Sequence, residues 1–202
     1  MISIIDYGRG NIYSIINALK YLNIAHKVVN EAQSLEGSKK IILPGVGAFK
    51  DAINQLDKRK LIEPIKNSVM AGVPILGICL GMQLFSSKSY EFGETNGFDF
   101  IPGEVKQIPK GVEDRIPNIG WRSIYPYKNN NTSYINYKNM MYFVHSYGFF
   151  PKDNKDIVAY TEFNSCSIPI LVRKNNIIGC QFHPEKSGKN GLDFLNWFCN
   201  FF

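Results

Sequence analysis

The first half of the chain alternates short apolar segments with longer segments whose apolar residues recur at helical spacing. Apolar runs at residues 2–6, 27–29, 40–43 and 74–78 predict buried strands. Helical spacing follows Asn11, which is a candidate N-cap, then occupies residues 48–70 and resumes at residue 81. Strands that alternate with helices in steps of this size predict a mostly parallel central sheet flanked by helices.

The second half is richer in strands than the first. Residues 103–180 contain short β-rich runs at 141–144, 157–161, 168–173 and 177–182, separated by Pro, Gly and Asn, with a turn at 129–132. A final helix over 189–202 carries aromatic residues on two sides, which indicates burial on more than one face. The 202 residues are therefore interpreted as one α/β domain, residues 1–202, with β-rich additions in its second half.

Composition excludes several classes of protein. The net charge is +6, but the Lys and Arg residues are scattered and form no block of five, so nucleic-acid binding is not expected. No apolar run approaches the roughly 18 residues that a membrane span needs, and the N-terminus lacks a signal peptide's basic region. The four cysteines include no C-x-x-C pair, so no metal site is expected, and a reducing cytoplasm is predicted.

Gly77-Ile78-Cys79-Leu80-Gly81 follows the last strand of the first half. A nucleophile on a sharp strand-to-helix turn needs small residues two positions away on each side, because the chain crowds itself there. Such a turn also sets the thiol at a helix N-terminus, whose partial positive charge favours the thiolate. Cys79 is therefore either a nucleophile or a structural cysteine in a tight turn, and this segment alone does not separate the two.

A second segment supplies a base. In an extended segment residues i and i+2 point to the same side, so His183 and Glu185 can face one site, with the carboxylate orienting the imidazole. His145 is the other candidate base, but no acid lies near it in the sequence. The pairing favours His183 over a structural role for this residue and over His145.

A glycine-rich loop follows the third strand. Gly45 and Gly47 allow backbone N–H groups near Val46 and Gly47 to converge on an anionic oxygen. Together with the N–H of Leu80, which follows the candidate nucleophile, this loop could form an oxyanion hole. A simple tight turn is the alternative.

Three other functions agree less well with these residues than a thiol hydrolase does. A dinucleotide fingerprint at Gly8 and Gly10 fails at Tyr13, where a small residue is needed. In an α/β-hydrolase the acid precedes the histidine, whereas Glu185 follows His183. A catalytically inactive binding subunit would not need all three of Cys79, His183 and Glu185.

The chain resembles the class I glutamine amidotransferases, which implies their flavodoxin-like fold. The resemblance covers nearly the whole chain and rests on Pro44-Gly-Val-Gly47, Gly77-Ile-Cys-Leu-Gly-Met-Gln83, Phe143-Val-His-Ser-Tyr147 and Gln181-Phe-His-Pro-Glu-Lys-Ser187. Within that family it is most similar to glutaminase subunits of imidazole glycerol phosphate synthase, through Asp6-Tyr-Gly-Arg-Gly-Asn11, Gly47-Ala-Phe49 and Asn118-Ile-Gly-Trp121.

The resemblance implies hydrolysis of L-glutamine by a catalytic triad of Cys79, His183 and Glu185, without a cofactor. It also implies substrate contacts and contacts with a (β/α)₈ cyclase, which forms a heterodimer with such subunits, receives the ammonia and makes imidazole glycerol phosphate and AICAR. The implied substrate-binding residues are Gly47, Gln83, Glu91, Ser146 and Tyr147, and the implied interface residues are Asn11, Asn118 and Trp121.

Two positions depart from the subfamily pattern. Asn118 stands where a histidine is usual, and Arg122 stands where an asparagine is usual. Neither position is catalytic in the family. Similar subunits supply ammonia for acetamidino-sugar synthesis in surface-polysaccharide pathways, and that destination is the alternative to histidine biosynthesis.

Overall fold

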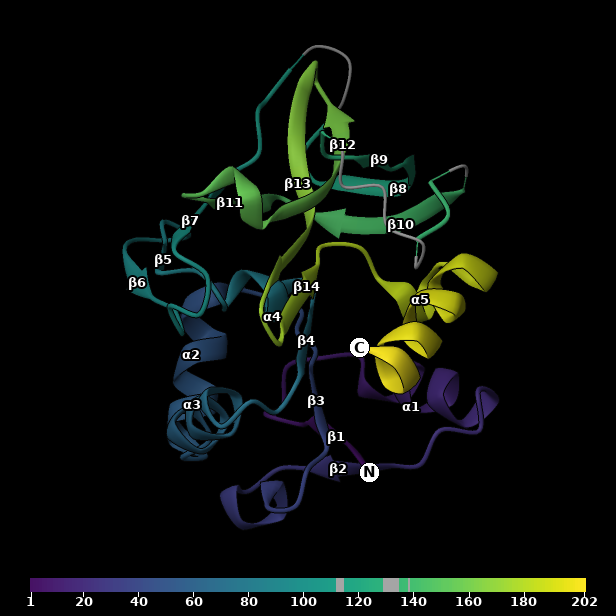
Figure 1. Ribbon diagram of the computed structural model, residues 1–202. Helices are drawn as coiled ribbons and strands as arrows, with labels where there is room; N and C mark the ends of the chain where they lie inside the picture. Colours follow the sequence, from purple (N-terminus) through teal and green to yellow (C-terminus); the bar gives the residue numbers. More distant parts are fainter. Residues whose placement is uncertain (112–114, 129–134, 138) are drawn as a thin grey trace.

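The computed structural model describes residues 1–111, 115–128, 135–137 and 139–202, and its centre is an eight-stranded sheet (Figure 1). Five parallel strands come first, and three antiparallel strands extend the sheet. In sheet order they are β2 (His26–Val29), β1 (Ile2–Ile5), β3 (Lys40–Leu43), β4 (Ile75–Ile78), β14 (Ile177–Cys180), β13 (Cys166–Lys174), β12 (Ile157–Phe163) and β9 (Tyr125–Pro126). The parallel part has the flavodoxin-like order, which confirms the predicted fold.

Helices cover both faces of the parallel strands. α1 (Ile12–Tyr21) and α5 (Gly188–Phe201) pack on one face, whereas α2 (Phe49–Lys58) and α3 (Ile62–Met70) pack on the other (Figure 1). Neighbouring residues of β1 show the pattern, because Ile4 belongs to the core on the α1 side and Ile5 to the core on the α2 side. Strands buried on both faces explain the continuous apolar runs in the sequence.

Three details differ from the sequence-based expectations. The helical segment over 48–70 is two helices, because Lys60 adopts a positive φ of 55° between α2 and α3. The helix expected from residue 81 is only one turn, α4 (Leu80–Gln83). Tyr13 is exposed rather than packed against β1, so its size does not exclude a dinucleotide-binding turn. The sheet order, rather than Tyr13, identifies the fold.

The β-rich additions lie beyond the carboxyl ends of β3 and β4 (Figure 1). A two-stranded sheet pairs β10 (Met140–His145) with β8 (Asn118–Ser123). A four-stranded sheet contains β11 (Tyr147–Pro151), β7 (Gly103–Gln107), β5 (Lys88–Ser89) and β6 (Thr95–Asn96). The predicted turn at 129–132 lies outside the described residues. Three 3₁₀ turns, η1 (Ala32–Leu35), η2 (Asn154–Asp156) and η3 (Pro184–Lys186), complete the described elements.

No helix in the described ranges combines the length and hydropathy that crossing a lipid bilayer requires.

The turn between β4 and α4 leaves no room for side chains at its two glycines. A Cβ on Gly77 would lie 2.7 Å from the backbone of Gly81, and a Cβ on Gly81 would lie 1.8 Å from the carbonyl oxygen of Leu43. Both neighbours are backbone atoms of the packed core, so neither can move aside cheaply. These contacts confirm the steric reason for glycine on both sides of Cys79.

We expect Gly81→Ala to lower the free energy of unfolding by about 3 kcal/mol, because α4 must separate from β3 to admit the methyl group. Gly10→Ala is the matched control, since its Cβ would meet Pro44 at an ordinary 3.4 Å, and its cost should stay below about 1 kcal/mol. Urea unfolding of both variants measures the difference. Equal stabilities would show that the turn tolerates a side chain.

Candidate active site

The β4–α4 turn presents Cys79 at the carboxyl edge of the sheet. Cys79 has a φ of 55° and a ψ of −111°, a conformation that residues other than glycine rarely adopt. Its backbone N–H donates to the Cys180 carbonyl at 2.7 Å, which ties the turn to the end of β14. Such strain in a packed turn is typical of functional sites. The predicted elbow is therefore present, with Cys79 at its apex.

His183 and Glu185 form a buried pair beside the elbow. Nδ1 of His183 lies 2.8 Å from Oε1 of Glu185, and both side chains are almost fully buried. The pairing does not arise as expected from alternation along a strand, because Glu185 lies in η3. The backbone N–H of His183 donates to the Tyr142 carbonyl at 2.9 Å, so β10 fixes the main chain from which the imidazole extends.

The charge of His183 is set by its neighbours. Burial by itself lowers the pKa of His183, but the Cys79 thiolate and then the Glu185 carboxylate outweigh burial and raise it to about 10. Nε2, the other ring nitrogen, is buried without a well-formed hydrogen bond, so it is free to exchange a proton. At neutral pH this raised pKa favours the imidazolium form of His183.

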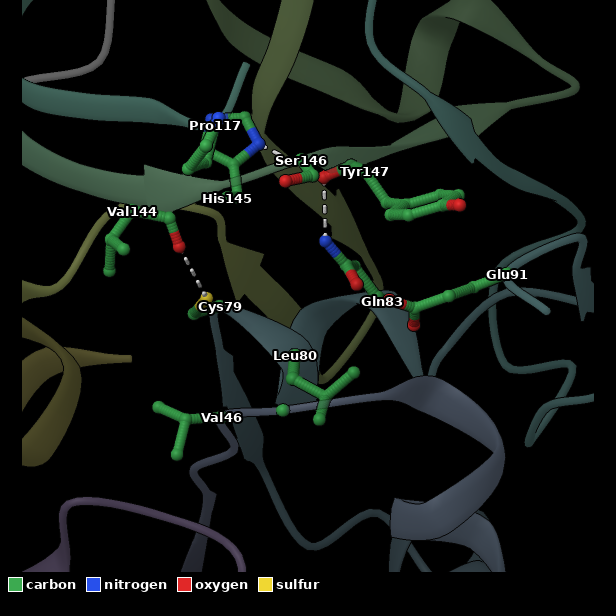
Figure 2. Close-up of a pocket in the computed structure, with 11 residues that line it drawn as sticks. Val46, Cys79, Leu80, Gln83, Glu91, Pro117, Val144, His145, Ser146 and Tyr147 are labelled. Atoms are coloured by element: carbon green, nitrogen blue, oxygen red, sulfur yellow. Dashed lines mark hydrogen bonds between the residues drawn. The ribbon is translucent and has the colours of Figure 1, made fainter.

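A pocket of about 300 Å³ opens over Cys79 (Figure 2). It brings together the residues that the sequence predicted for the oxyanion hole and for substrate binding, from segments far apart in the chain. These are Val46, Gly47, Leu80, Gln83, Glu91, Ser146 and Tyr147. His183 and Glu185 do not line the pocket. The volume suits a ligand the size of a single amino acid.

The pocket offers mainly hydrogen-bond acceptors at its Gln83 end. Gln83 Nε2 donates to the Tyr147 carbonyl at 2.8 Å and to Gln181 Oε1 at 2.9 Å, so both of its N–H groups are committed. Its oxygen remains available to a ligand donor. Glu91 accepts a 2.7 Å hydrogen bond from the Phe49 N–H, although burial still raises the pKa of this carboxyl above its ordinary value.

His145 lines the same pocket but is only a weak base. Burial lowers the pKa of His145 to about 4, so the ring is neutral. Nδ1 donates to the Tyr147 carbonyl at 2.9 Å, and Nε2 accepts from Nδ2 of Asn118 at 2.9 Å. Both ring nitrogens are therefore occupied, in agreement with the preference for His183 over His145.

The three predicted interface residues differ in exposure. Trp121 is exposed on β8, and Asn11 is half-buried, where its side chain caps α1 by accepting from the Ser14 N–H at 3.4 Å. Asn118 is only 1% exposed and hydrogen-bonds His145 and Arg122. The expectation that the Asn118 side chain contacts a partner is therefore wrong for this conformation, since it faces the interior.

Three residues at the site were missed by the sequence analysis. Pro117 and Val144 line the pocket, and the Cys79 sulfur lies 3.9 Å from the Val144 carbonyl oxygen. Gln181 is fully buried and donates from Nε2 to that sulfur at 3.5 Å. Its position two residues before His183, in the same extended segment, was a usable signal that both side chains face Cys79.

Comparison with known proteins identifies the family. The glutamine amidotransferase class-I family matches residues 3–200. This chain belongs to that family. HisH subunits of imidazole glycerol phosphate synthase are close relatives. The chain is 45% identical to that of Caldanaerobacter subterraneus, covering 98% of this chain and 97% of the relative. It is 41% identical to that of Prochlorococcus marinus, covering 96% and 95%, respectively.

Solved structures agree on the fold. A crystal structure of a glutamine amidotransferase superposes with a TM-score of 0.73 and 18% identity, covering 97% of this chain and 96% of the other. PurLQS from Thermotoga maritima gives a TM-score of 0.75 and 19% identity, covering 98% of this chain and 97% of the other. The class I glutamine amidotransferase fold is thus found by sequence and by structure.

The neutral state of His145 makes stability depend on pH. Between pH 6.5 and about 4 the unfolded chain binds a proton on His145 and the folded chain does not, so the free energy of unfolding falls as the pH falls. His145→Gln removes this contribution. Between pH 7.5 and 5 we expect the wild type to lose about 2 kcal/mol more than this variant.

Urea unfolding at the two pH values measures this difference. Comparing the wild type with His145→Gln cancels the titration of His183, which both proteins share. Equal pH dependence in the two proteins would show that folding does not lower the pKa of His145.

Proposed function

We propose that residues 1–202 form a single domain that hydrolyses L-glutamine to glutamate and ammonia, with Cys79 as nucleophile, His183 as acid and base, and Glu185 as the orienting carboxylate. The observation that carries this proposal is a strained elbow cysteine that lines the pocket, with a buried His–Glu pair next to its sulfur. Membership of the class I glutamine amidotransferases supports the choice of substrate.

The first half of the reaction forms a thioester. The Cys79 thiolate attacks the side-chain amide carbon of glutamine, and a C–S bond forms as the carbonyl electrons move onto oxygen. Nε2 of the His183 imidazolium then gives its proton to the amide nitrogen, the C–N bond breaks, and ammonia leaves. The raised pKa of His183 suits this step, because the proton is present at neutral pH.

The second half regenerates the enzyme. Neutral His183 takes a proton from water, the hydroxide adds to the thioester carbon, and the C–S bond breaks to release the side-chain carboxylic acid and the thiolate. The acid then loses its proton to solvent and leaves as glutamate. Glu185 accepts from Nδ1–H throughout, which leaves Nε2 as the nitrogen that exchanges protons. The resting imidazolium and thiolate are restored.

The oxyanion formed in both halves needs hydrogen-bond donors. Leu80 is the first residue of α4, where the backbone N–H has no acceptor within the helix. Val46 and Gly47 line the pocket on the opposite loop, and Gly47 has a φ of 99° that suits glycine. The N–H of Leu80 and one N–H from this loop are proposed to hold the oxyanion.

The remaining pocket residues are proposed to bind the amino-acid end of glutamine. Glu91 and the free oxygen of Gln83 are acceptors suited to the α-ammonium group. Gly47, Ser146 and Tyr147 complete the substrate site around the α-carboxylate and the side chain.

The destination of the ammonia is proposed from the relatives. The curated relatives of this chain are named as subunits of imidazole glycerol phosphate synthase. Their names favour histidine biosynthesis over acetamidino-sugar synthesis as the destination of the ammonia. We propose a heterodimer with a (β/α)₈ cyclase and transfer of ammonia through that subunit. Exposed Trp121 and the half-buried Asn11 are retained as proposed contacts.

The free state of all four cysteines supports a reducing compartment, which we propose is the cytoplasm.

We expect His183→Asn to abolish glutamine hydrolysis, because among the described residues His183 is the group beside Cys79 that is suited to supply and remove the proton. His145→Asn should leave a measurable fraction, because His145 is neutral and bonded at both nitrogens. Glutamate release, measured with each purified variant under the same conditions, distinguishes them. Greater damage from His145→Asn would reverse the assigned roles.

Activity should also depend on the partner. A glutaminase working alone wastes glutamine, and the loops after β3, β4 and β10 lie at one edge of the sheet that a barrel could cover. We expect weak hydrolysis by the isolated chain and a rise of about tenfold or more with the substrate-bound cyclase, equivalent to about 1.4 kcal/mol in the barrier.

The assay compares glutamate release by the isolated chain and by the reconstituted complex, and a pull-down from the native cell supplies the partner. Full activity without any partner would refute the coupling. Stimulation by a sugar-pathway complex alone would move the function to acetamidino-sugar synthesis.

A further inference from the structure

Gln181 is a buried polar residue that the triad mechanism does not use. Its side chain has no exposed surface, and its backbone N–H donates to the Ile170 carbonyl at 2.8 Å, which fixes the segment against β13. From there Nε2 reaches the Cys79 sulfur at 3.5 Å. A buried amide has few alternatives to such a bond, because an unpaired N–H in the interior is costly.

A second amide determines which way the Gln181 side chain points. Gln83 Nε2 donates to Gln181 Oε1 at 2.9 Å, so the oxygen of Gln181 is taken and its NH₂ group is turned to the sulfur. Gln83 is itself held, because its other N–H donates to the Tyr147 carbonyl at 2.8 Å. Rotating the Gln181 amide by half a turn would place two NH₂ groups against each other.

We propose that Gln181 is a positioning residue that holds the Cys79 sulfur in its attacking place by donating a hydrogen bond to the thiolate. This inference rests on the proposed glutaminase function and assigns a role to a residue outside the triad. An N–H group aimed at sulfur favours the charged form and restricts side-chain rotation. The other polar neighbours of the sulfur in the described residues are the His183 imidazole and, at 3.9 Å, the Val144 carbonyl.

The hydrogen-bond chain continues beyond Tyr147 to β8. The Tyr147 carbonyl also accepts from Nδ1 of His145, whose Nε2 accepts from Asn118. Oδ1 of Asn118 in turn accepts from Nε of Arg122 at 2.6 Å. Asn118 and Arg122 are the two departures from the subfamily pattern, and together they give His145 a donor that fixes its tautomer. The orientation of Gln181 is therefore secured through interior contacts up to β8.

His183, Tyr7 and Cys180 are titratable groups that interact electrostatically with the Cys79 sulfur. Burial raises the pKa of Tyr7 and of Cys180 well above their ordinary values, so both are neutral around pH 7. His183 is thus the charged neighbour of Cys79, and Gln181 is the neutral donor. Replacing Gln181 leaves the imidazolium in place, which separates the two effects.

The test is alkylation of the free thiol by iodoacetamide as a function of pH, with mass spectrometry identifying the modified cysteine. In Gln181→Met, which keeps the volume and removes the donor, we expect the midpoint of Cys79 alkylation to rise by about one pH unit or more. We also expect kcat for glutamine to fall about tenfold, with KM changed less than about threefold.

Thr161→Val is the matched control. Thr161 is a buried polar residue whose hydroxyl donates to the Ser123 carbonyl at 2.7 Å, outside the chain that reaches Cys79. In Thr161→Val, the midpoint pH of Cys79 alkylation and the kcat for glutamine should equal those of the wild type. An unchanged midpoint in a folded Gln181→Met, or an equal shift in Thr161→Val, would overturn the proposal.

A measurement on the unaltered sequence covers the case in which Gln181→Met does not fold. In protein labelled with ¹⁵N-glutamine, the side-chain amide resonances of Gln181 should shift when Cys79 is alkylated, and those of solvent-exposed Gln33 should not. Absence of any shift would contradict the bond. Alkylation and NMR need no glutamine. A chain that shows both effects but does not hydrolyse glutamine would therefore contradict the proposed glutaminase function and leave the positioning role of Gln181 intact.

Discussion

The backbone of Cys79 is the constraint on which the site depends. A positive φ at a residue with a side chain costs on the order of 1–3 kcal/mol, and it persists only where the surroundings enforce it. Here β4 is buried on both faces, the Cys79 N–H is held by β14, and Gly81 lies directly against the Leu43 carbonyl. The strained turn holds the buried Cys79 side chain at the floor of the pocket.

The same strand pairing brings nucleophile and base together. β14 lies parallel to β4 in the sheet, and the chain leaves β14 in an extended segment that carries Gln181 and then His183 past the elbow. Residues about a hundred positions apart in sequence therefore share one edge. β10 adds the Tyr142 carbonyl under His183 and the Val144 carbonyl beside the sulfur. The β-rich additions thus support the site rather than merely decorating the sheet.

The sequence was sufficient to predict what depends on local pattern. Two-sided burial shows as apolar runs, and the elbow shows as paired glycines, so the fold and the position of Cys79 were predictable. The pairing of His183 with Glu185 was expected from strand alternation, but it forms because η3 turns the carboxylate back to the imidazole. Asn118 was misplaced because resemblance alone carries no information about burial. Gln181 was missed because its role depends on which way an amide is turned, and Gln83, about a hundred residues away, decides that.

His145 and His183 show why residue type alone does not assign a role. Both imidazoles are almost completely buried, and burial lowers the pKa of each. His183 has the Cys79 thiol group and the Glu185 carboxylate beside it, which reverse the effect, whereas the partners of His145 are a carbonyl and the neutral amide of Asn118. A neutral amide cannot compensate for the desolvation of a charge. One histidine therefore carries a proton that it can donate, and the other serves as a fixed donor and acceptor inside a hydrogen-bond chain.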